Sequence, residues 1–598
     1  MTTKNNQQLE TMRHSLSHIM AAAVLELWPS VKFAIGPAIE NGFYYDFDFG
    51  EHTKETKENE VKRIGEDDLT RIEKKMKHLI KQNLKFERFE LNVNKAMDRE
   101  KKVGQNYKME LIEDLKKAGE KKVSYYKVDN FEDLCKGPHI ESTGIIAKNS
   151  FKLTKIAGAY WQGDEKNKML TRIYGVAFET KKELDEYLKM MQEAEKRDHR
   201  RLGKELDLFC FSDLVGAGLP LFTPKGTIII EELKKHIEKV CGNYGFEKVI
   251  TPHLAKIKLY ELSGHAQKFS EELFHVSSGR GHKFVMKPVQ CPHQTQIYAS
   301  RLRSYRDLPI RYMESEKQYR AEQSGEVGGL NRVYAITVED GHSFCRVDQV
   351  KEEVKGMVNI IKEFYSALGL WKNHWVSLSL RDYGHPEKYI GEPNDWDKCE
   401  QMLEKVAQEM KLDAKKCEGE AALYGPKLDF MFKDALGKEI QIPTVQLDFA
   451  TPKKFGLYYT NEKGKEEHPV MVHRAILGSY ERFLALLIEH FAGAFPVWLS
   501  PAQVKIISVG EGHIKYCHKL ADEFKEYEIR VEVDDANETV GNKIRKAVKE
   551  KVPYILVIGD KEIKSDKLSV RDRGSDKVRQ AGKEEFVKEI MEGIRNKE

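Results

Sequence analysis

Between residue 206 and about residue 497, short apolar runs follow one another without a regular helix after each of them. The strand-like runs lie near 310–314, 332–338, 427–432 and 445–449, and a further strand at Lys248–Thr251 ends at Pro252. A doubly wound parallel sheet requires a helical crossover after each strand, so this pattern favours an antiparallel α+β core. Helices are predicted at Thr227–Cys241 and at about 474–491.

The chain has 598 residues, enough for three or more domains, and composition divides it into four parts. Residues 1–180 mix helical and strand patterns, which predicts an α+β domain. Residues 181–205 are densely charged, with apolar residues at helical spacing, which predicts a partly exposed connecting helix. Residues 206–497 form the antiparallel block, and residues 500–598 alternate strand and helix, which predicts a compact α/β domain.

The formal net charge is only +4, so any RNA-binding surface has to be local. The eight cysteines are scattered, the first residues are polar, and no apolar run approaches the ~20 residues of a membrane span. We therefore expect a cytoplasmic protein that does not enter a membrane. In that reducing setting a functional cysteine is a ligand or a reactive thiol.

The common nucleotide-binding and hydrolase motifs are missing. No G-x-x-x-x-G-K-[ST] phosphate loop occurs, and residues 341–345 (GHSFC) lack the second glycine of a nucleophile elbow. Instead, Arg320 and Glu322 follow an apolar strand, and Ser479 and Arg482 precede an apolar helix. Each arginine taken singly is typical of an ion-pair residue. Two arginines on a rigid scaffold suit a bent triphosphate, because guanidinium grips phosphate in a fixed fork.

Together with Pro252, these segments resemble the three signatures of class II aminoacyl-tRNA synthetases. Further segments are similar to the threonyl-tRNA synthetase family: residues 218–220 (GLP), 286–288 (MKP), 291–292 (CP), 424–427 (YGPK), 444–449 (TVQLDF) and 473–479 (HRAILGS). The similarity runs from about residue 10 to residue 598, without the small ubiquitin-like domain that often begins this family. It implies a class II antiparallel-sheet catalytic core, an amino-terminal α+β editing domain and a carboxy-terminal α/β anticodon-binding domain.

The resemblance also implies an activity and its partners. A member of this family activates L-threonine with ATP, transfers it to tRNA(Thr) and hydrolyses mischarged seryl-tRNA(Thr). It is a homodimer, with the helix and strand before Pro252 at the two-fold interface. Two other readings stay open: another class II synthetase, such as a prolyl or seryl enzyme, and a non-catalytic tRNA-binding paralogue.

Matching positions supply candidate residues for ATP, which binds with Mg²⁺, and for threonine. The ATP candidates are Arg320, Glu322, Arg332, Gln441, Ser479 and Arg482, and the catalytic candidates among them are Arg320, Glu322 and Arg482. The threonine candidates are Asp340, Tyr424 and Gln446. By resemblance, Arg320 holds the α-phosphate, Arg482 holds the γ-phosphate, and Glu322 accepts a hydrogen bond from the adenine amino group.

Cys291, His342 and His473 match the ligands of the family's catalytic zinc ion. Their spacing alone is typical of packing residues, because no C-x-x-C pair marks them. Three protein ligands leave one coordination position of zinc open. In the family, that ion binds the amino group and the hydroxyl of threonine, whereas an apolar pocket separates hydroxyl from methyl only by roughly 100-fold. The implied cofactor is therefore one Zn²⁺ per subunit.

Several positions near this site depart from the family pattern. Ile336 replaces an aromatic residue that stacks on adenine, Val338 replaces an amide, and Ile442 and Pro443 replace Cys-Gly. The family's Asn-Cys-Pro-x-His reads QCPHQ at residues 290–294. The ligands and the arginines are kept, so the activity is expected, while the effect of these departures on affinity is not predicted.

His14 and His18 lie four residues apart in a helical stretch, hence on one face, and Cys135 and His139 have the same spacing. The set is similar to the four-ligand zinc site of alanyl-type editing domains. Resemblance to the threonyl editing domain implies a hydrolytic pocket without metal, with Asp133 as a further polar group, and packing is a third alternative. We favour the metal-free pocket. Serine differs from threonine by one methyl group, which provides only ~1–3 kcal/mol of discrimination in binding. A second, hydrolytic site is therefore needed to remove serine from mischarged tRNA.

Three residues of the last domain, Asn537, Glu562 and Arg571, match positions that contact the anticodon in the family. Such residues read exposed bases through edge hydrogen bonds and stacking. Each alone is typical of an ordinary solvated residue. The predicted helix that carries Lys543 and three further basic residues up to position 549 adds local positive charge for the RNA backbone.

Overall fold

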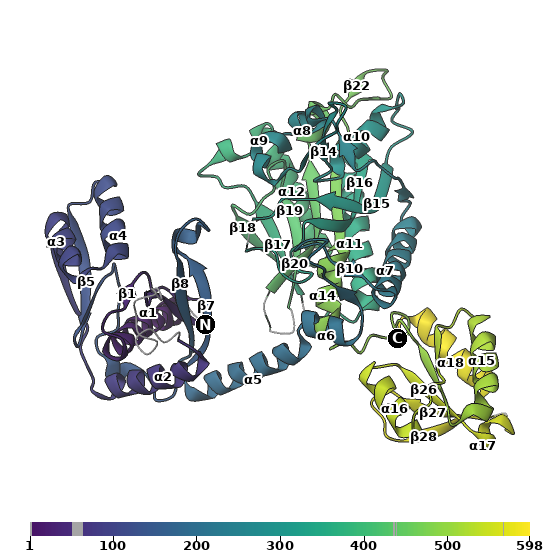
Figure 1. Cartoon of the computed structure of the whole chain (residues 1–598). Helices are drawn as coiled ribbons and strands as arrows, with labels where there is room; N and C mark the ends of the chain where they lie inside the picture. Colours follow the sequence, from purple (N-terminus) through teal and green to yellow (C-terminus); the bar gives the residue numbers. More distant parts are fainter. Residues whose placement is uncertain are drawn as a thin grey trace. The chain divides into compact units, whose positions relative to one another are not determined.

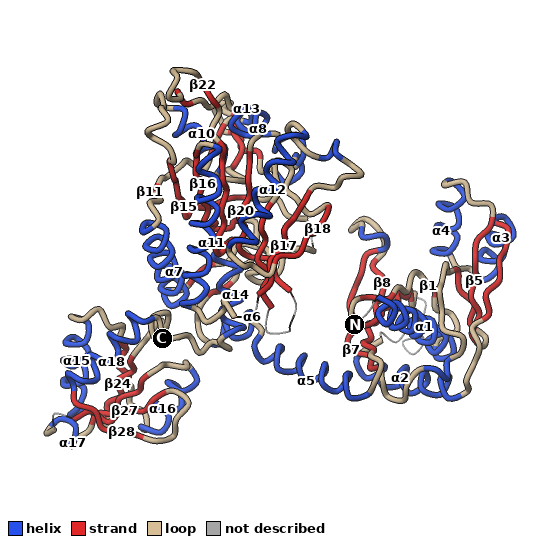
Figure 2. Tube along the Cα trace, turned by 180° about the vertical axis from the view of Figure 1, so that it is seen from behind, coloured by secondary structure: helices blue, strands red, loops and turns tan. Residues whose placement is uncertain are grey.

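The computed structural model describes residues 3–50, 64–323, 325–372, 374–433, 437, 439–565 and 567–598, without the side chains of residues 3–6. The chain forms two compact units, Met1–Gln192 and Glu193–Glu598. Figures 1 and 2 show the helices and strands of each unit.

The first unit contains two antiparallel sheets. The larger has strand order β1-β3-β8-β7, with β2 paired to β3, and the smaller has order β4-β5-β6. Phe43, Tyr45 and Phe47 of β3 are buried in one core with α1 and α2, because a strand points every second side chain to the same face. The elements are α1 (Thr3–Leu27), β1 (Lys32–Phe33), β2 (Ala38–Ile39), β3 (Gly42–Asp48), α2 (Glu66–Lys81), β4 (Glu87–Asn92), α3 (Val93–Val103), α4 (Asn106–Lys117), β5 (Lys122–Val128), β6 (Phe131–Leu134), β7 (Phe151–Tyr160) and β8 (Met169–Ala177).

The predicted connecting helix at 181–205 is two helices, α5 (Lys181–Arg197) and α6 (His199–Glu205). The break falls at Asp198, whose side chain accepts a hydrogen bond from the backbone N–H of Arg200 and so caps α6. A single continuous helix was therefore a wrong prediction at this one position, where an N-cap residue begins a new helix.

An eight-stranded sheet forms the centre of the second unit, with strand order β11-β15-β16-β23-β20-β19-β17-β18. All inner pairs are antiparallel, and only the two edge pairs, β11 with β15 and β17 with β18, are parallel. Helices α7, α11, α12 and α14 share one apolar core with this sheet. The antiparallel α+β core predicted from the sequence is thus confirmed.

The helices and strands of the antiparallel block carry the candidate residues of the catalytic core. They are β9 (Phe209–Cys210), β10 (Leu221–Phe222), α7 (Pro224–Asn243), β11 (Glu247–Lys248), β12 (Leu254–Ala255), α8 (Ile257–Ser263), α9 (His265–Lys268), β13 (His275–Ser277), β14 (Lys283–Met286), α10 (Cys291–Ala299), β15 (Ile310–Tyr319), β16 (Ala335–Cys345), α11 (Val350–Ala367), β17 (His374–Leu380), α12 (Pro393–Glu409), β18 (Ala414–Glu418), β19 (Lys427–Lys433), β20 (Glu439–Asp448), α13 (Ala450–Lys454), β21 (Tyr459–Thr460), β22 (Glu466–Glu467), β23 (Val470–Ser479) and α14 (Tyr480–His490).

One helix prediction in this block was wrong over part of its length. Residues 474–479, placed in a helix by their apolar character, belong to strand β23, and α14 begins only at Tyr480. The apolar run is buried both in the strand and in the helix, so hydrophobicity alone did not separate them. Ser479 ends the strand and caps the helix, since its Oγ accepts the backbone N–H of Arg482.

The last hundred residues alternate as predicted. Their five-stranded sheet has order β25-β24-β26-β27-β28, with the first three strands parallel and the last pairs antiparallel. Strand β28 and the short helix α17 were not predicted. The elements are β24 (Val504–Ser508), α15 (Glu511–Lys525), β25 (Val531–Asp534), α16 (Val540–Lys549), β26 (Tyr554–Ile558), α17 (Asp560–Ile563), β27 (Lys567–Asp572), β28 (Val578–Gly582) and α18 (Lys583–Asn596).

Across the described residues, no helix combines the length and the apolar character that crossing a membrane requires.

Candidate functional site

Strand register brings the predicted metal ligands together. His342 of β16 is paired directly with His473 of β23, and His473 is paired on its other side with Gln446 of β20. Directly opposed residues of an antiparallel pair point to the same face, so the three side chains form a row across the sheet. Cys291, the first residue of α10, completes the set, and the ligand atoms of Cys291, His342 and His473 all lie within 4.8 Å of one another.

Each histidine of this central cluster is fixed through one ring nitrogen. Nδ1 of His342 lies 2.7 Å from Oε1 of Gln294, and Nε2 of His473 lies 3.0 Å from the carboxylate of Asp448. Nε2 of His342 is buried and has no hydrogen-bond partner among the described residues. Both rings therefore keep one nitrogen for the interior of the cluster.

The charges of the central cluster fit a cation. Burial raises the pKa of the Cys291 thiol and lowers the pKa of His342, so in this dry site a thiolate requires a compensating positive charge. A buried thiolate with two neutral imidazoles is the donor set that zinc prefers. The residues present thus fit a metal ion, which would occupy the space that the three ligand atoms share.

The three threonine candidates lie beside this cluster. The hydroxyl of Tyr424 donates to Oε1 of Gln446 at 2.7 Å, and the Tyr424 ring stacks on the His473 ring with centroids 4.9 Å apart. Asp340 lies two residues before His342 on β16, with its carboxylate 3.8 Å from Nε2 of that ring. Loss of solvent around the carboxyl raises the pKa of Asp340 to about 7.

All six ATP candidates line one cavity of about 700 Å³. Within it the Arg332 guanidinium donates to Glu322 at 2.7 Å, so these two candidates form an ion pair with each other. The Gln441 amide donates to Asp429 at 2.6 Å. Arg320 and Arg482 make no ion pair with any described residue, which leaves both guanidinium groups available to phosphate.

The departures from the family pattern fall on this cavity. Ile336, Val338 and Ile442 all line it, whereas Pro443 is buried in β20 and is not part of the lining. Sequence reasoning did not identify two other polar contributors, Asn331 and Glu439, which also line the cavity. Both are polar residues without a motif of their own, so nothing in the local sequence distinguished them.

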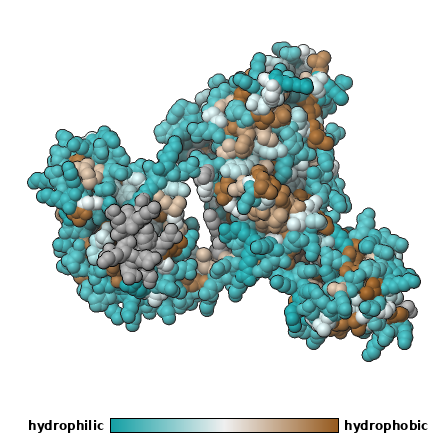
Figure 3. Space-filling model, in the orientation of Figure 1, coloured by the Kyte–Doolittle hydropathy of each residue, from teal (hydrophilic) through white to brown (hydrophobic). Residues whose placement is uncertain are grey.

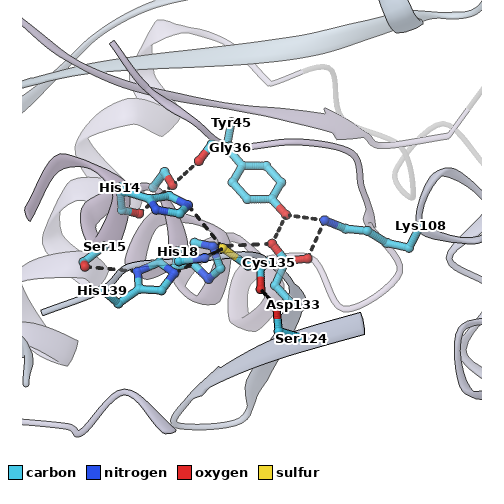
Figure 4. Close-up of polar contacts among 12 residues, drawn as sticks. His14, Ser15, His18, Gly36, Tyr45, Lys108, Ser124, Asp133, Cys135 and His139 are labelled. Carbon is cyan, nitrogen blue, oxygen red and sulfur yellow. Dashed lines mark hydrogen bonds and ion pairs between the residues drawn. The ribbon is translucent and has the colours of Figure 1, made fainter. Parts of the chain in front are cut away.

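A second cluster, the amino-terminal cluster, joins His14, His18, Cys135 and His139, whose ligand atoms also lie within 4.8 Å of one another (Figure 4). The two histidines of α1 lie one helical turn apart, and the loop after β6 brings the other two residues against that face. The Cys135 sulfur lies 3.3 Å from Nε2 of His14 and 3.3 Å from Nε2 of His139. Sequence spacing therefore predicted this grouping correctly.

Hydrogen bonds define the tautomers of two of these rings. The carbonyl of Pro138 only accepts, so Nδ1 of His14, at 3.2 Å from it, carries the hydrogen. The Ser15 hydroxyl donates to Thr11 and accepts from Nδ1 of His139 at 3.1 Å. Both imidazoles thus present an Nε2 lone pair to the Cys135 thiol. Burial lowers the pKa of both rings and raises that of the thiol to about 11, so all three groups stay neutral.

A buried ion pair borders the amino-terminal cluster and was missed by sequence reasoning. Asp133, a predicted residue, pairs with the Lys108 ammonium, accepts from the Tyr45 hydroxyl at 2.6 Å, and lies 3.7 Å from Nε2 of His18 (Figure 4). Lys108 is only 4% exposed. A lysine in a charged helix such as α4 is ordinarily solvated, so only the fold reveals that this one is turned inward.

The anticodon candidates lie in three different elements of the carboxy-terminal domain: Asn537 in a loop, Glu562 in α17 and Arg571 in β27. Asn537 is exposed after β25. The Glu562 carboxylate accepts from the backbone of Gly559 at 3.0 Å and from Ser569 at 2.7 Å, and Arg571 of β27 pairs with Asp576 at 2.8 Å. No hydrogen bond or ion pair joins the three candidates within the described chain.

The prediction that Lys543 adds to a basic RNA-facing surface was wrong. Lys543 is 2% exposed, and its ammonium donates to the carbonyl and the hydroxyl of Ser508 at 3.0 and 3.1 Å. It lies on the inner face of α16, where its three donors satisfy the ends of neighbouring strands.

Three family models match the chain. Residues 274–491 match the tRNA synthetase class II core domain (G, H, P, S and T), residues 503–593 match the anticodon binding domain, and residues 123–174 match the threonyl and alanyl tRNA synthetase second additional domain. The core match covers the antiparallel block from residue 274 to residue 491, and the anticodon match covers the carboxy-terminal α/β sheet. The third match includes Asp133, Cys135 and His139.

Individual relatives agree with these models. The threonine–tRNA ligase of Gloeobacter violaceus is 46% identical over 95% of this chain and 89% of its own length. That of Geobacillus kaustophilus is 43% identical over 99% of this chain and 88% of its own length. A crystal structure described as the RNA binding domain of threonyl-tRNA synthetase from Cryptosporidium parvum superposes with a TM-score of 0.63 at 32% identity, over 66% of this chain and 98% of that one.

Proposed function

The chain belongs to the threonyl-tRNA synthetase family, and on that premise we propose which reaction each of its clusters of polar residues carries out. The enzyme activates threonine with ATP, charges tRNA with it and carries an editing domain. The observation that supports the assignment of residues best is the row formed by His342, His473 and Gln446, which lies on the same sheet as the lining of the ATP cavity.

We assign Cys291, His342 and His473 as ligands of one Zn²⁺ per subunit. A bound zinc ion would accept both the amino group and the hydroxyl of threonine as ligands, whereas valine, which lacks the hydroxyl, could supply only the amino group. Tyr424 and Gln446 hold the threonine side chain beside the cluster, and the Asp340 carboxylate receives the amino group. The donor set, its burial and the unpaired Nε2 of His342 support this assignment.

The ATP cavity positions the phosphates for attack by the threonine carboxylate. Arg320 binds the α-phosphate and Arg482 the γ-phosphate, with Mg²⁺ accompanying ATP, and Glu322 accepts from the adenine amino group. Glu322 also accepts from Arg332, so this ion pair lies at the adenine end of the proposed ATP site. Such a reaction depends on positioning and charge neutralisation rather than on a protein acid or base. Ser479 and Gln441 complete the lining.

Hydrolysis of mischarged seryl-tRNA(Thr) is assigned to the amino-terminal cluster, without a metal. The Cys135 thiol has one hydrogen and can donate to only one of the two Nε2 atoms, so the other imidazole keeps a free lone pair. That imidazole accepts one proton from the water that attacks the ester, which is general-base catalysis by a neutral imidazole. His18 and Asp133 lie at the edge of the same pocket, where the Lys108 ammonium pairs with the Asp133 carboxylate. Because this carboxylate is already neutralised by Lys108, it offers no net negative charge to a divalent cation.

Anticodon reading is assigned to Asn537, Glu562 and Arg571. Deletion of residues 500–598 should leave threonyl-adenylate formation intact and abolish charging, because the ATP and zinc residues all lie before residue 483. Arg571→Ala should weaken charging through tRNA recognition. Normal charging by this variant, with unchanged discrimination of anticodon mutants, would remove Arg571 from the assignment.

We also propose a cytoplasmic homodimer with domains at 1–180, 206–497 and 500–598. The segment between β11 and Pro252 leaves the apolar side chain of Ile250 76% exposed, and a second copy would cover it. Apolar patches also interrupt the mostly hydrophilic face shown in Figure 3. Light scattering tests the oligomeric state, and a fully active monomer would rule out the dimer.

ATP–pyrophosphate exchange with a panel of amino acids tests the central assignment. Exchange should depend on threonine, be weak with serine, be absent with valine and be lost after strong zinc chelation. Exchange that is driven equally well by valine, or that survives complete removal of zinc, would contradict the proposed role of the metal.

A further inference from the structure

Gln294, on helix α10, makes one side-chain hydrogen bond, and that bond is to a proposed zinc ligand. Its Oε1 lies 2.7 Å from Nδ1 of His342, and both residues are fully buried, each with 0% exposure. Its Nε2 is buried and has no hydrogen-bond partner in the described part of the chain. The position belongs to the QCPHQ segment, where the family pattern ends in histidine.

The amide oxygen determines which nitrogen of His342 faces the cluster. An oxygen only accepts, so Nδ1 carries the hydrogen and Nε2 keeps its lone pair. The opposite amide orientation would turn an N–H toward Nδ1 and would force the hydrogen onto Nε2. A ring that carries hydrogen on its inward nitrogen cannot ligate a metal, so the orientation with oxygen toward Nδ1 is the one that leaves the site competent.

Burial of Gln294 is unfavourable for the fold alone. Its unpaired Nε2 loses its hydration without gaining a partner, which an apolar side chain of the same size would avoid. A residue kept only for packing would therefore be apolar here. What the amide supplies is the acceptor for His342.

The second histidine is held differently. His473 donates from Nε2 to the carboxylate of Asp448, an anionic acceptor, and so faces the cluster through Nδ1. One ligand is therefore backed by a charged group and the other by a neutral one. Gln294 orients His342 without adding a further negative charge to a site that already has Asp340 and Asp448 beside it.

We propose that Gln294 is a positioning residue of the zinc site, which fixes the tautomer and orientation of His342 and thereby sets how tightly the metal is held. The inference rests on the zinc centre proposed above. Outer partners of ligating histidines typically account for 10–100-fold in metal affinity, so removal of this acceptor should weaken zinc binding by about that factor.

Four variants of the full-length protein test the proposal. Gln294→Leu and Gln294→Met remove the acceptor at similar volume, whereas Gln294→His and Gln294→Glu restore an acceptor for the Nδ1 hydrogen. Gln296→Leu, an exposed position on the same helix, is the matched control. Zinc affinity is measured by competition with a chromogenic chelator, and ligand geometry by the visible bands of the cobalt-substituted proteins. Thermal unfolding of the metal-free proteins reports the fold separately.

We expect the leucine and methionine variants to lose zinc about 10–100-fold more readily, with altered cobalt bands, and to be at least as stable as wild type without metal. The histidine and glutamate variants, and the control, should bind zinc close to wild type. Wild-type affinity in both apolar variants would overturn the role of Gln294, as would an equal loss in all four. Should the apolar variants fail to fold, weak binding by a folded glutamate variant would overturn it. A wild-type protein without zinc would instead overturn the zinc centre itself.

Discussion

The central and amino-terminal clusters have nearly the same donor atoms and different surroundings. Both consist of histidines around one cysteine, with ligand atoms within 4.8 Å of one another; the central residues are all buried, whereas only His18 is buried in the amino-terminal cluster. Beside the central cluster lie two carboxylates, Asp340 and Asp448, whereas the amino-terminal cluster has the Lys108 ammonium next to Asp133. The geometry of the donor atoms alone therefore does not distinguish a metal centre from a hydrolytic pocket. We base the two different proposed roles on the charges around the donors.

The largest effect is expected when a central ligand is removed. Cys291→Ser should lose zinc and reduce threonine-dependent exchange by more than about 100-fold, since even outer partners of ligands account for 10–100-fold. Metal analysis and exchange kinetics measure the two losses. Cys210→Ser, an exposed thiol of the same unit, is the control and should be unchanged. A Cys291→Ser enzyme that lacks zinc and keeps full activity would show that the central cluster, like the amino-terminal cluster, works without a metal.

The matching change in the amino-terminal cluster should leave activation untouched. His14→Ala with His18→Ala should slow hydrolysis of preformed seryl-tRNA by about 100-fold or more, as expected when a general base is lost. Threonylation should stay near wild type, and seryl-tRNA should accumulate. His78→Ala, an exposed histidine of the same unit, serves as control. An unchanged rate of seryl-tRNA hydrolysis in the double variant would refute the editing assignment.

The charge beside the amino-terminal cluster is tested by Lys108→Met. The change leaves Asp133 buried without its cation, which should destabilise the first unit by about 3–5 kcal/mol and slow seryl-tRNA hydrolysis. Denaturant unfolding and deacylation assays measure the two effects. Lys101→Met, at an exposed lysine, should change neither. If Lys108→Met instead acquires a second zinc ion, the ammonium was what excluded it.

Metal content distinguishes the clusters without any substitution. The purified wild-type protein should contain one zinc ion per chain, held by the central cluster. The Cys291→Ser variant should then contain none. Stoichiometric zinc that remains in this variant would place a metal at His14, His18, Cys135 and His139 and would reject the metal-free pocket.

The smallest effect concerns pH. Lowered pKa values keep His14 and His139 neutral as the pH falls through the ordinary range of histidine, and a thiol pKa of about 11 keeps Cys135 protonated at the alkaline side. Enzymatic seryl-tRNA hydrolysis should therefore change less than about twofold between about pH 6.5 and about pH 8.5, once uncatalysed hydrolysis is subtracted. A rise with a midpoint near 6.5 would show an imidazole that titrates normally.

The sequence pattern predicted the fold class and the grouping of the amino-terminal cluster because both depend on regular spacing, whereas Cys291, His342 and His473 were identified only through the resemblance to the family. The i, i+4 spacing in His14 and His18 needs only a helix, and Arg320 and Arg482 lie in recognisable motifs. It failed where tertiary contacts decide. Lys108 and Lys543 have the sequence context of solvated lysines, yet each is buried with partners from distant strands. Residues 474–479 were not recognised as part of a strand because a strand that is buried on both faces has no alternation of polar and apolar residues.

Strand β16 bears Ile336 and Val338 at the ATP cavity and Asp340 and His342 at the central cluster. Alternate residues of a strand are spaced by ~6.6 Å, so the four side chains mark a line of roughly 20 Å. The strand is hydrogen-bonded to β15 on one side and β23 on the other, and cannot slide. A single elongated inhibitor that contacts both the ATP cavity and the central cluster therefore has to match this fixed spacing of side chains. A resistance substitution at one end of the strand would leave the contacts of the inhibitor at the other end intact.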